Sequence, residues 1–322
     1  MTPAAAMIEV RNVSKRFAGR IDLADRIARM VRGKSRDATV RALDNVSLRV
    51  CEREVVGLVG ESGCGKSTLG RIVSRILEPT QGEVHWEGER LAVQMIFQDP
   101  YASLNPRMRV ADIVGEAPVV HGLVASRDRE DYVTEILSRV GLDRSAMRRF
   151  PHQFSGGQRS RIGIARALAV KPRFLVCDEA VAALDVSIQA QVLNLFIRLR
   201  EELALTYLFI SHDLGVIRHV SDRVIVMYLG RIVETGPTSD VYARPNHPYT
   251  TALIAEVPRI EARHRAYVPI RGEIPSPLSP PAGCHFHPRC PHAFARCREE
   301  VPQLREIAPG RHSACHLNES PP

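Results

Sequence analysis

The chain has 322 residues, of which 44% are hydrophobic and 25% charged, as in a globular protein of one large or two smaller domains. No apolar run approaches the ~18 residues that cross a bilayer, and the N-terminus lacks the pattern of a secretory signal, so we expect neither a membrane span nor export. The net charge of +8 permits nucleic acid, anionic lipid or acidic partners, but heavy use of arginine explains it equally well, and no basic run carries interleaved aromatics.

Apolar spacing predicts strands that alternate with helices along the first two thirds of the chain. The predicted strands are 7–18, 41–50, 55–60, 82–88, 92–98, 174–179, 206–213 and 223–228. One predicted helix follows a glycine-rich turn at 60–67. Three further helices are predicted at 128–140, 155–170 and 187–203. This alternation predicts an α/β fold around a mostly parallel sheet.

Two segments depart from this alternation. Residues 19–39 are polar and rich in arginine, and we expect them to form an insertion or a long loop. From about residue 236 the proline content rises and the periodicity fades. We therefore predict two regions, 1–236 and 237–322, the second a separate and irregular appendage.

A complete G-x-x-x-x-G-K-[ST] motif stands between a predicted strand and a predicted helix. Glycines let backbone N–H groups turn inward, and the helix N-terminus adds positive potential, so the segment can cradle phosphates. Lys66 is expected to reach the β- and γ-phosphates, and Ser67 to offer Mg²⁺ an oxygen. We expect ATP to be bound by Gly60, Ser62, Gly63, Cys64, Gly65, Lys66, Ser67 and Thr68.

Two acids close the buried strand FLVCDE. Asp178 is placed to hold Mg²⁺ directly or through a water, and Glu179 to orient the attacking water. Phosphoryl transfer depends on such positioning and charge neutralisation more than on covalent chemistry. The pair therefore predicts nucleotide hydrolysis.

Four of the seven cysteines lie near the C-terminus, with the spacing C-x5-C-x6-C-x17-C. This is not the C-x2-C pair of a zinc ribbon, whereas iron–sulfur clusters accept varied spacing. Zinc with mixed Cys/His ligands, an iron–sulfur cluster and free buried thiols all stay open from spacing alone. The candidate ligands are Cys284, Cys290, Cys297 and Cys315; Cys51, Cys64 and Cys177 are expected to be small buried hydrophobes.

The segment FSGGQ, residues 154–158, resembles the signature of ABC-type ATPases. Such a resemblance implies a P-loop NTPase with a RecA-like core sheet, and a helical subdomain at about 99–166. It also implies roles for single residues: Phe17 stacks on adenine, Gln98 senses the γ-phosphate and the metal ion, and His212 is the switch histidine. Gln98, Glu179 and His212 are thus the expected catalytic residues, with Ser67, Gln98 and Asp178 around Mg²⁺.

Nucleotide domains of this superfamily pair head to tail. Ser155-Gly156-Gly157 at a predicted helix start forms a second anion cradle, which one chain does not need for one nucleotide. We therefore expect the partner's ATP, rather than the chain's own, to be contacted by Ser155, Gly156, Gly157, Gln158 and Asp185.

A closer resemblance covers residues 40–317. Segments such as FQDPYASLNPRM, HPYTTAL and GEIPSPLSPPAGCHFHPRCP are similar to the ATP-binding subunits of bacterial dipeptide/oligopeptide (and nickel) importers. The chain departs from them at Arg53, which stands in place of a usual glycine. The resemblance implies an ATPase on the cytoplasmic face of the inner membrane, peripheral to it. Its implied partners are a second, similar ATPase and two permeases, contacted through residues 101–106, and indirectly a substrate-binding protein.

The same resemblance implies that Cys284, Cys290, Cys297 and Cys315 hold a [4Fe–4S] cluster, with Zn²⁺ as the alternative. Because these residues follow the nucleotide domain, we expect them to lie away from ATP chemistry. The cargo stays open between peptides, nickel, opines and glycosides. A soluble ABC ATPase acting on nucleic acid is the other alternative, although the chain has neither two nucleotide domains nor a long coiled-coil insertion.

Overall fold

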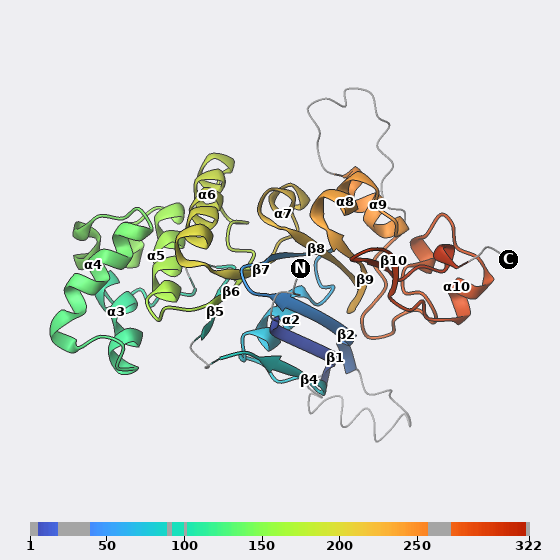
Figure 1. Ribbon diagram of the computed structural model, residues 1–322, viewed down its shortest axis with the longest axis horizontal. Helices are drawn as coiled ribbons and strands as arrows, with labels where there is room; N and C mark the ends of the chain where they lie inside the picture. Colours follow the sequence, from blue (N-terminus) through green and yellow to red (C-terminus); the bar gives the residue numbers. More distant parts are fainter. Residues whose placement is uncertain (1–5, 19–38, 89–91, 100–101, 257–271, 320–322) are drawn as a thin grey trace, which may run out of the picture.

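The computed structural model describes most of the chain, namely residues 6–18, 39–88, 92–99, 102–256 and 272–319. All but the last residue of the predicted insertion at 19–39 lies outside these ranges. Figure 1 shows an elongated molecule with a group of helices at one end, a central body of strands and the C-terminal region at the other end. Within the described ranges, no helix is both long and apolar enough to span a bilayer.

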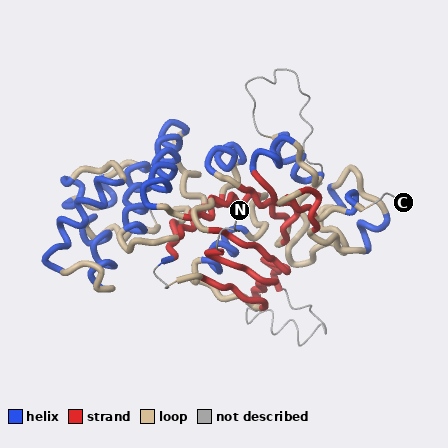
Figure 2. Tube along the Cα trace, viewed as in Figure 1, coloured by secondary structure: helices blue, strands red, loops and turns tan. Residues whose placement is uncertain are grey.

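An eight-stranded mixed sheet forms the centre of the molecule (Figure 2). Its strands are β3 (Val55–Val59), β5 (Val93–Ile96), β6 (Phe174–Asp178), β7 (Thr206–Ile210), β8 (Arg223–Tyr228), β9 (Arg231–Pro237), β10 (Arg305–Ala308) and β11 (Arg311–Ser313). They lie in the order β10-β11-β9-β8-β3-β7-β6-β5. Neighbours from β8 to β5 are parallel, whereas β9, β11 and β10 add antiparallel pairs. The parallel strands are buried on both faces and therefore read as continuous apolar runs.

A second, antiparallel sheet covers one face of the centre. It consists of β1 (Ala6–Ala18), β2 (Thr39–Cys51) and β4 (Gln81–Trp86), in the order β2-β1-β4. Successive side chains of a strand point to opposite faces. Val56 and Leu58 of β3 accordingly join the hydrophobic core on the side of this sheet and of α2 (Lys66–Val73). Val55 and Val59 join the core on the other side, which the remaining helices cover.

The remaining helices lie at both ends of the molecule and over one face of the central sheet (Figure 1). They are α3 (Val110–Val120), α4 (Arg129–Arg139), α5 (Gly156–Leu168), α6 (Val186–Leu203), α7 (Leu214–Val220), α8 (Thr238–Ala243), α9 (Pro248–Ala255) and α10 (Ala295–Glu299). Short 3-10 helices occur at Ser126–Asp128, Arg144–Arg148, Pro151–Gln153, His287–Arg289 and His316–Asn318. The predicted stripe of α4 is buried as its spacing indicates, since Val133, Ile136, Leu137 and Val140 are each at most 5% exposed.

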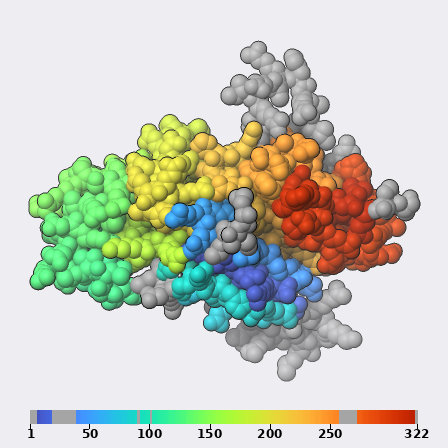
Figure 3. Space-filling model, in the orientation of Figure 1, coloured from blue at the N-terminus to red at the C-terminus, as the bar shows by residue number. Residues whose placement is uncertain are grey.

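The C-terminal region is more regular than we expected, because part of it extends the central sheet. Strand β11 pairs with β9, with His312 opposite Thr235. Arg311 forms a 3.2 Å ion pair with the fully buried Glu234 of β9. The region also lies against β2 (Figure 3), where the amide of Arg41 donates to the carbonyl of Pro277. The two C-terminal strands are too short to show a period in the sequence.

Candidate functional site

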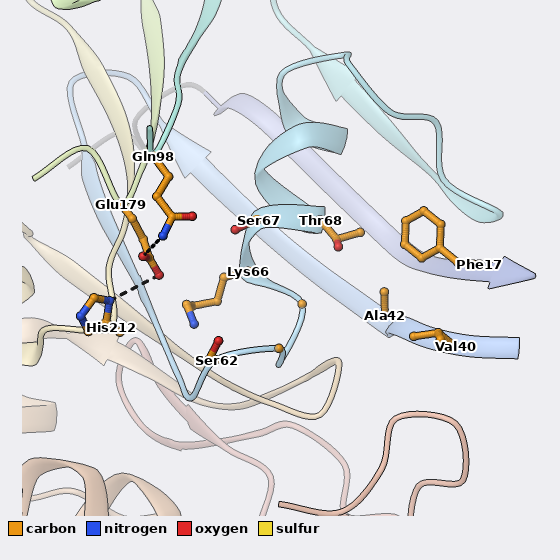
Figure 4. Close-up of a pocket in the computed structure, with 12 residues that line it drawn as sticks. Phe17, Val40, Ala42, Ser62, Lys66, Ser67, Thr68, Gln98, Glu179 and His212 are labelled. Carbon is orange, nitrogen blue, oxygen red and sulfur yellow. Dashed lines mark hydrogen bonds and ion pairs between the residues drawn. The ribbon is translucent and has the colours of Figure 1, made fainter. Parts of the chain in front are cut away.

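A cavity of about 600 Å³ lies at the carboxyl ends of β5, β6 and β7, between these strands and the antiparallel sheet (Figure 4). In open α/β sheets, ligands bind at this end of the strands. The residues that line the cavity are Phe17, Val40, Ala42, Ser62, Gly63, Gly65, Lys66, Ser67, Thr68, Gln98, Glu179 and His212. Most of the predicted nucleotide residues therefore meet in one place.

The loop between β3 and α2 has the conformation that its glycines permit. Gly63 and Gly65 have φ angles of 79° and 107°, in the left-handed region that favours glycine. A Cβ on Gly65 would lie 2.3 Å from the carbonyl oxygen of Ala42. Lys66 opens α2, and its Nζ donates to the carbonyls of Gly60 at 2.7 Å and Glu61 at 3.0 Å. The ammonium group and the helix N-terminus thus create positive potential for phosphates.

Two oxygen donors meet beside this loop. The hydroxyl of Ser67 donates to Oδ1 of Asp178 across 2.9 Å. Asp178 is 3% exposed, and burial raises the pKa of its carboxyl, helped by the nearby charge of Glu179 and opposed by the Ser67 hydrogen bond. A hydroxyl and a carboxylate are the hard oxygen ligands that Mg²⁺ prefers, so this pair fits the predicted metal ion.

Three predicted catalytic side chains form a connected group (Figure 4). Nε2 of Gln98 donates to Oε2 of Glu179 at 2.7 Å, and Nδ1 of His212 lies 3.4 Å from Oε1 of the same carboxylate. Glu179 follows β6 with a φ of 48°, and its amide donates to the carbonyl of Ile210 at the end of β7. The chain thereby turns sharply after Asp178, so the two acids point into different surroundings.

The other end of the cavity is apolar. Phe17 of β1 is 40% exposed there, together with Val40 and Ala42 of β2. The ammonium of Lys15 lies 5.4 Å from the centroid of the Phe17 ring. Sequence reasoning found Phe17 but missed Val40 and Ala42, because short apolar residues in a strand carry no signal of a ligand surface.

The predicted signature residues do not line this cavity. Ser155 caps α5 in a capping box, in which its hydroxyl accepts from the amide of Gln158 and its amide donates to the Gln158 side chain. Gly157 packs against α6, since an added Cβ would lie 2.4 Å from a methyl of Ile188. Gly156 has more room, and Asp185, before α6, is exposed. Apart from the buried Gly157, these residues are at least partly exposed.

The four C-terminal cysteines line one small cavity, together with His247, His287, His292 and His316. Burial, and after it the other three thiols, raises the pKa of Cys315 to about 11, so thiolates are unfavourable there without a compensating cation. Thiols and imidazoles are, by residue type alone, ligands that zinc or an iron–sulfur cluster accepts. Across the parts of the chain that the structure describes, however, no three Cys, His, Asp or Glu side chains are arranged to hold a metal ion.

The C-terminal region contacts the phosphate-binding loop, contrary to our expectation that it lies away from ATP chemistry. Arg289 donates from both terminal nitrogens to the carboxylate of Glu61, at 2.7 and 2.9 Å. The hydroxyl of Tyr249 accepts from the Glu61 amide at 2.9 Å. Sequence reasoning missed these three residues, because an ion pair between positions 61 and 289 leaves no local pattern.

Two family models match the chain. Residues 43–182 match the model described as ABC transporter, and residues 233–297 match the one described as oligopeptide/dipeptide transporter, C-terminal region. Among solved structures, the dimeric ATP-binding cassette MJ0796, in a post-hydrolysis state bound to ADP and Pi, is 28% identical, with a TM-score of 0.61, over 72% of this chain and 99% of that one. These matches agree with the predicted ABC-type P-loop fold.

Similar proteins of known sequence extend over nearly the whole chain. The oligopeptide transport ATP-binding protein AppF of Bacillus subtilis is 47% identical, over 97% of both chains. The putative oligopeptide transport ATP-binding protein YkfD of the same organism is 50% identical, over 88% of this chain and 91% of the relative. On this evidence the chain belongs to the ATP-binding subunits of the oligopeptide/dipeptide ABC transporter family.

Proposed function

We propose that this protein is the ATP-hydrolysing subunit that energises import of di- or oligopeptides through a multi-subunit ABC importer. One observation carries the proposal: a single chain matches both the ABC transporter model and the C-terminal region of oligopeptide/dipeptide transporters. AppF, named for oligopeptide transport, supports it over almost the full length. The cavity contains the groups that ATP hydrolysis needs, since it combines a phosphate-binding loop with a carboxylate and a histidine.

Most residues of the cavity have a role in this proposal. Lys66 and the amides of Gly63, Cys64, Gly65, Ser67 and Thr68 bind the phosphates, while Phe17 stacks on adenine. Ser67, Asp178 and Gln98 hold Mg²⁺, which when bound neutralises phosphate charge. Glu179 orients and polarises the attacking water, and His212, 3.4 Å from it, helps to fix that carboxylate. Gln98 joins the metal site to the chain that continues toward α3, and so can report nucleotide binding to the helices.

ATP binding is proposed to close a head-to-tail dimer with a second, similar ATPase. Ser155, Gly156, Gly157, Gln158 and Asp185 would then contact the partner's ATP. Their position outside the lining of the cavity supports this, as does the start of α5 at Gly156, where the helix dipole attracts anions. Hydrolysis would reopen the dimer, and rocking of the two domains would pass to the membrane subunits.

The remaining partners are two permeases and, through them, a substrate-binding protein. We place the contact with the permeases in residues 101–106, just after Gln98; Tyr101 is outside the described part of the chain. The protein would then lie on the cytoplasmic face of the cell membrane as a peripheral subunit. No contact with nucleic acid is expected, because the net charge of +8 is its only support.

The four C-terminal cysteines are proposed to ligate a [4Fe–4S] cluster, with Zn²⁺ as the alternative. Support comes from the four thiols that line one cavity. The protein should be purified anaerobically and assayed for iron, sulfide, zinc and visible absorption. Four iron and four sulfide per chain would support the cluster; colourless protein with one zinc per chain would reject it.

The transport proposal is tested by reconstituting the chain in vesicles with a second ATPase, two permeases and a substrate-binding protein of the same importer family. Uptake of labelled di- and oligopeptides should require ATP and should stop with Glu179→Gln, while that variant still binds ATP. Uptake of nickel, an opine or a glycoside without peptide competition would reject the peptide cargo. ATPase activity that DNA stimulates and permeases do not would reject transport altogether.

A further inference from the structure

The phosphate-binding loop is held by two side chains from outside the nucleotide domain. Glu61, the second residue of the motif, is fixed at its amide by Tyr249 of α9 and at its carboxylate by Arg289. Its carbonyl in turn accepts from Nζ of Lys66. The position of Glu61 therefore helps to set the position of the ammonium group that meets the phosphates.

The contact between Arg289 and Glu61 is buried and two-pronged. The Arg289 side chain is 5% exposed and that of Glu61 is 21% exposed. The guanidinium carbon lies 5.9 Å from the ring centroid of Tyr228, whose hydroxyl is 3.4 Å from Nη1 of Arg289. A planar guanidinium bound through two nitrogens fixes direction as well as distance, which lysine cannot do.

The two residues that hold Glu61 are fixed by an aromatic cluster, to which Tyr249 belongs and against which Arg289 packs. Tyr228, Tyr249 and Phe286 pack with ring centroids 4.7 to 5.3 Å apart, and each is at most 2% exposed. Nδ1 of His285 lies 3.2 Å from the carbonyl of Leu229, while the amide of Gly230 donates to the carbonyl of Cys64 in the loop. The segment 285–289 is thereby tied to the loop through the β8–β9 turn as well.

The Arg289–Glu61 ion pair is not accounted for by a gain in folding stability. Desolvation of a buried ion pair offsets most of its attraction, so such a pair contributes little net stability. In addition, Nε of Arg289 is buried without a hydrogen-bond partner in the described structure. An arrangement with this cost is better accounted for by what it fixes, which is the geometry of the loop.

We propose that Arg289 and Tyr249 are positioning residues for ATP binding, which hold the phosphate loop in its binding conformation from the C-terminal region. The inference rests on the proposed ATPase function and adds to it a dependence of nucleotide affinity on residues more than 180 positions away. Neither residue lines the nucleotide cavity, so both act through Glu61. The apparent affinity of a loop that must be ordered to bind its ligand is proportional to the fraction of molecules in which the loop is already ordered, so a variant that lowers this fraction raises the Kd.

The test compares each variant with a matched control in the full chain. Tyr249→Phe and Tyr242→Phe each remove one buried hydroxyl with one hydrogen bond, but the Tyr242 hydroxyl donates to Leu214, far from the loop in sequence. Arg289→Gln and Arg311→Gln each break one buried Arg–Glu pair of the C-terminal region, but Arg311 pairs with Glu234. Melting temperature, Kd for a fluorescent ATP analogue, and KM and kcat are measured for these four variants and for Arg289→Lys.

Arg289→Gln should raise the Kd for nucleotide about tenfold and Tyr249→Phe about threefold, as loss of pre-organisation predicts. KM should rise with Kd while kcat at saturating ATP stays within about twofold. Arg289→Lys should restore only part of the affinity, because lysine cannot bind the carboxylate in two-pronged fashion. The controls should lower the melting temperature without changing Kd.

Equal Kd values for Tyr249→Phe and its control, or for Arg289→Gln and its control, would overturn the inference. Tyr249→Phe keeps the ring packing and so allows the decision even if Arg289→Gln fails to fold. If the unaltered protein binds and hydrolyses ATP but the variants match their controls, the positioning role of Arg289 and Tyr249 is wrong and the ATPase function stands. If the unaltered protein does not bind ATP, the proposed function itself is wrong.

Discussion

The hydroxyl of Ser67 donates to the buried carboxylate of Asp178 at 2.9 Å, although the two residues are 111 positions apart. This hydrogen bond joins the first turn of α2 to the end of β6, and so brings the two halves of the predicted Mg²⁺ site together. Burial opposes the charge on Asp178, whereas a bound cation would favour it. A bound cation would therefore offset the free-energy cost of burying the charged Asp178 carboxylate.

Asp178→Asn should separate stability from nucleotide binding. The folded pKa of Asp178 lies above its unfolded value, so its contribution to stability is present at low pH and is lost as pH rises through the folded pKa. At pH 7 without nucleotide, the amide should raise the melting temperature, by roughly 2–4 °C per kcal/mol of relieved desolvation.

The further increase in melting temperature that Mg–ATP gives to the unaltered protein should be absent from this variant. Differential scanning fluorimetry with and without Mg–ATP measures both effects. A lower melting temperature without nucleotide would contradict our account of the buried charge. Ser67→Ala is the matched control for the melting temperature without nucleotide, since it removes the hydroxyl and keeps the buried carboxylate.

Gly156→Ala and Gly157→Ala should have different effects although they are neighbours in the signature. A Cβ on Gly157 would lie 2.4 Å from Ile188, and overpacking of this kind costs about 1–3 kcal/mol. A Cβ on Gly156 meets only Leu184, at 3.7 Å. Gly157→Ala should therefore lower the melting temperature, whereas Gly156→Ala should leave it unchanged and weaken ATP-dependent dimerisation and hydrolysis.

The dimerisation is measured by analytical ultracentrifugation with the partner ATPase and ATP. The proposal that this helix start contacts the partner's nucleotide would be wrong if Gly156→Ala formed the dimer with unaltered affinity and hydrolysed ATP at the unaltered rate.

His247 should make the protein sensitive to acid. It is 1% exposed, and burial lowers its pKa from 6.5 to about 4, because the charged imidazolium is disfavoured there. The unfolded chain therefore binds more protons between pH 6.5 and pH 4, so stability falls as pH falls through this window, by about 3 kcal/mol. His285 contributes in the same direction, since its pKa is also lowered to about 4.

His247→Asn tests this assignment. The Nδ1 of His247 accepts from the amide of Tyr249 at the start of α9, and asparagine is equally suited to cap a helix. Urea unfolding at pH 7 and pH 4.5 should show a smaller loss of stability in the variant than in the unaltered protein. An identical loss in the two proteins would assign the acid sensitivity to other groups.

Arg53 holds a backbone conformation that suits glycine. Its φ is 60°, its amide donates to the hydroxyl of Thr206 at 2.8 Å, and its carbonyl accepts from Arg200. Arg53→Gly keeps both backbone bonds and removes a Cβ clash of about 1–2 kcal/mol, while the greater freedom of glycine in the unfolded chain offsets roughly 0.5–1 kcal/mol, so it should raise the free energy of unfolding by about 1 kcal/mol. Arg53→Ala keeps the Cβ and is the control; an equal gain in both variants would mean that the arginine side chain, rather than the backbone, is the cause.

Some features of this protein follow from the sequence by itself. The phosphate motif at 60–67, the acids at 178 and 179 and the alternating strands and helices depend on local spacing, and each lies in or next to the predicted element. Such features are encoded by residues within a few positions of one another, so a linear pattern is sufficient to find them.

Other features are decided by the tertiary structure. β10 and β11 join the central sheet because β11 pairs at long range with β9, and the contact of Arg289 with Glu61 spans 228 positions. The convergence of Gln98, Glu179 and His212 depends on the order β5-β6-β7-β3, which the sequence does not state. These contacts form only once the core has brought distant segments together, and buried pairing of that kind has no period along the chain.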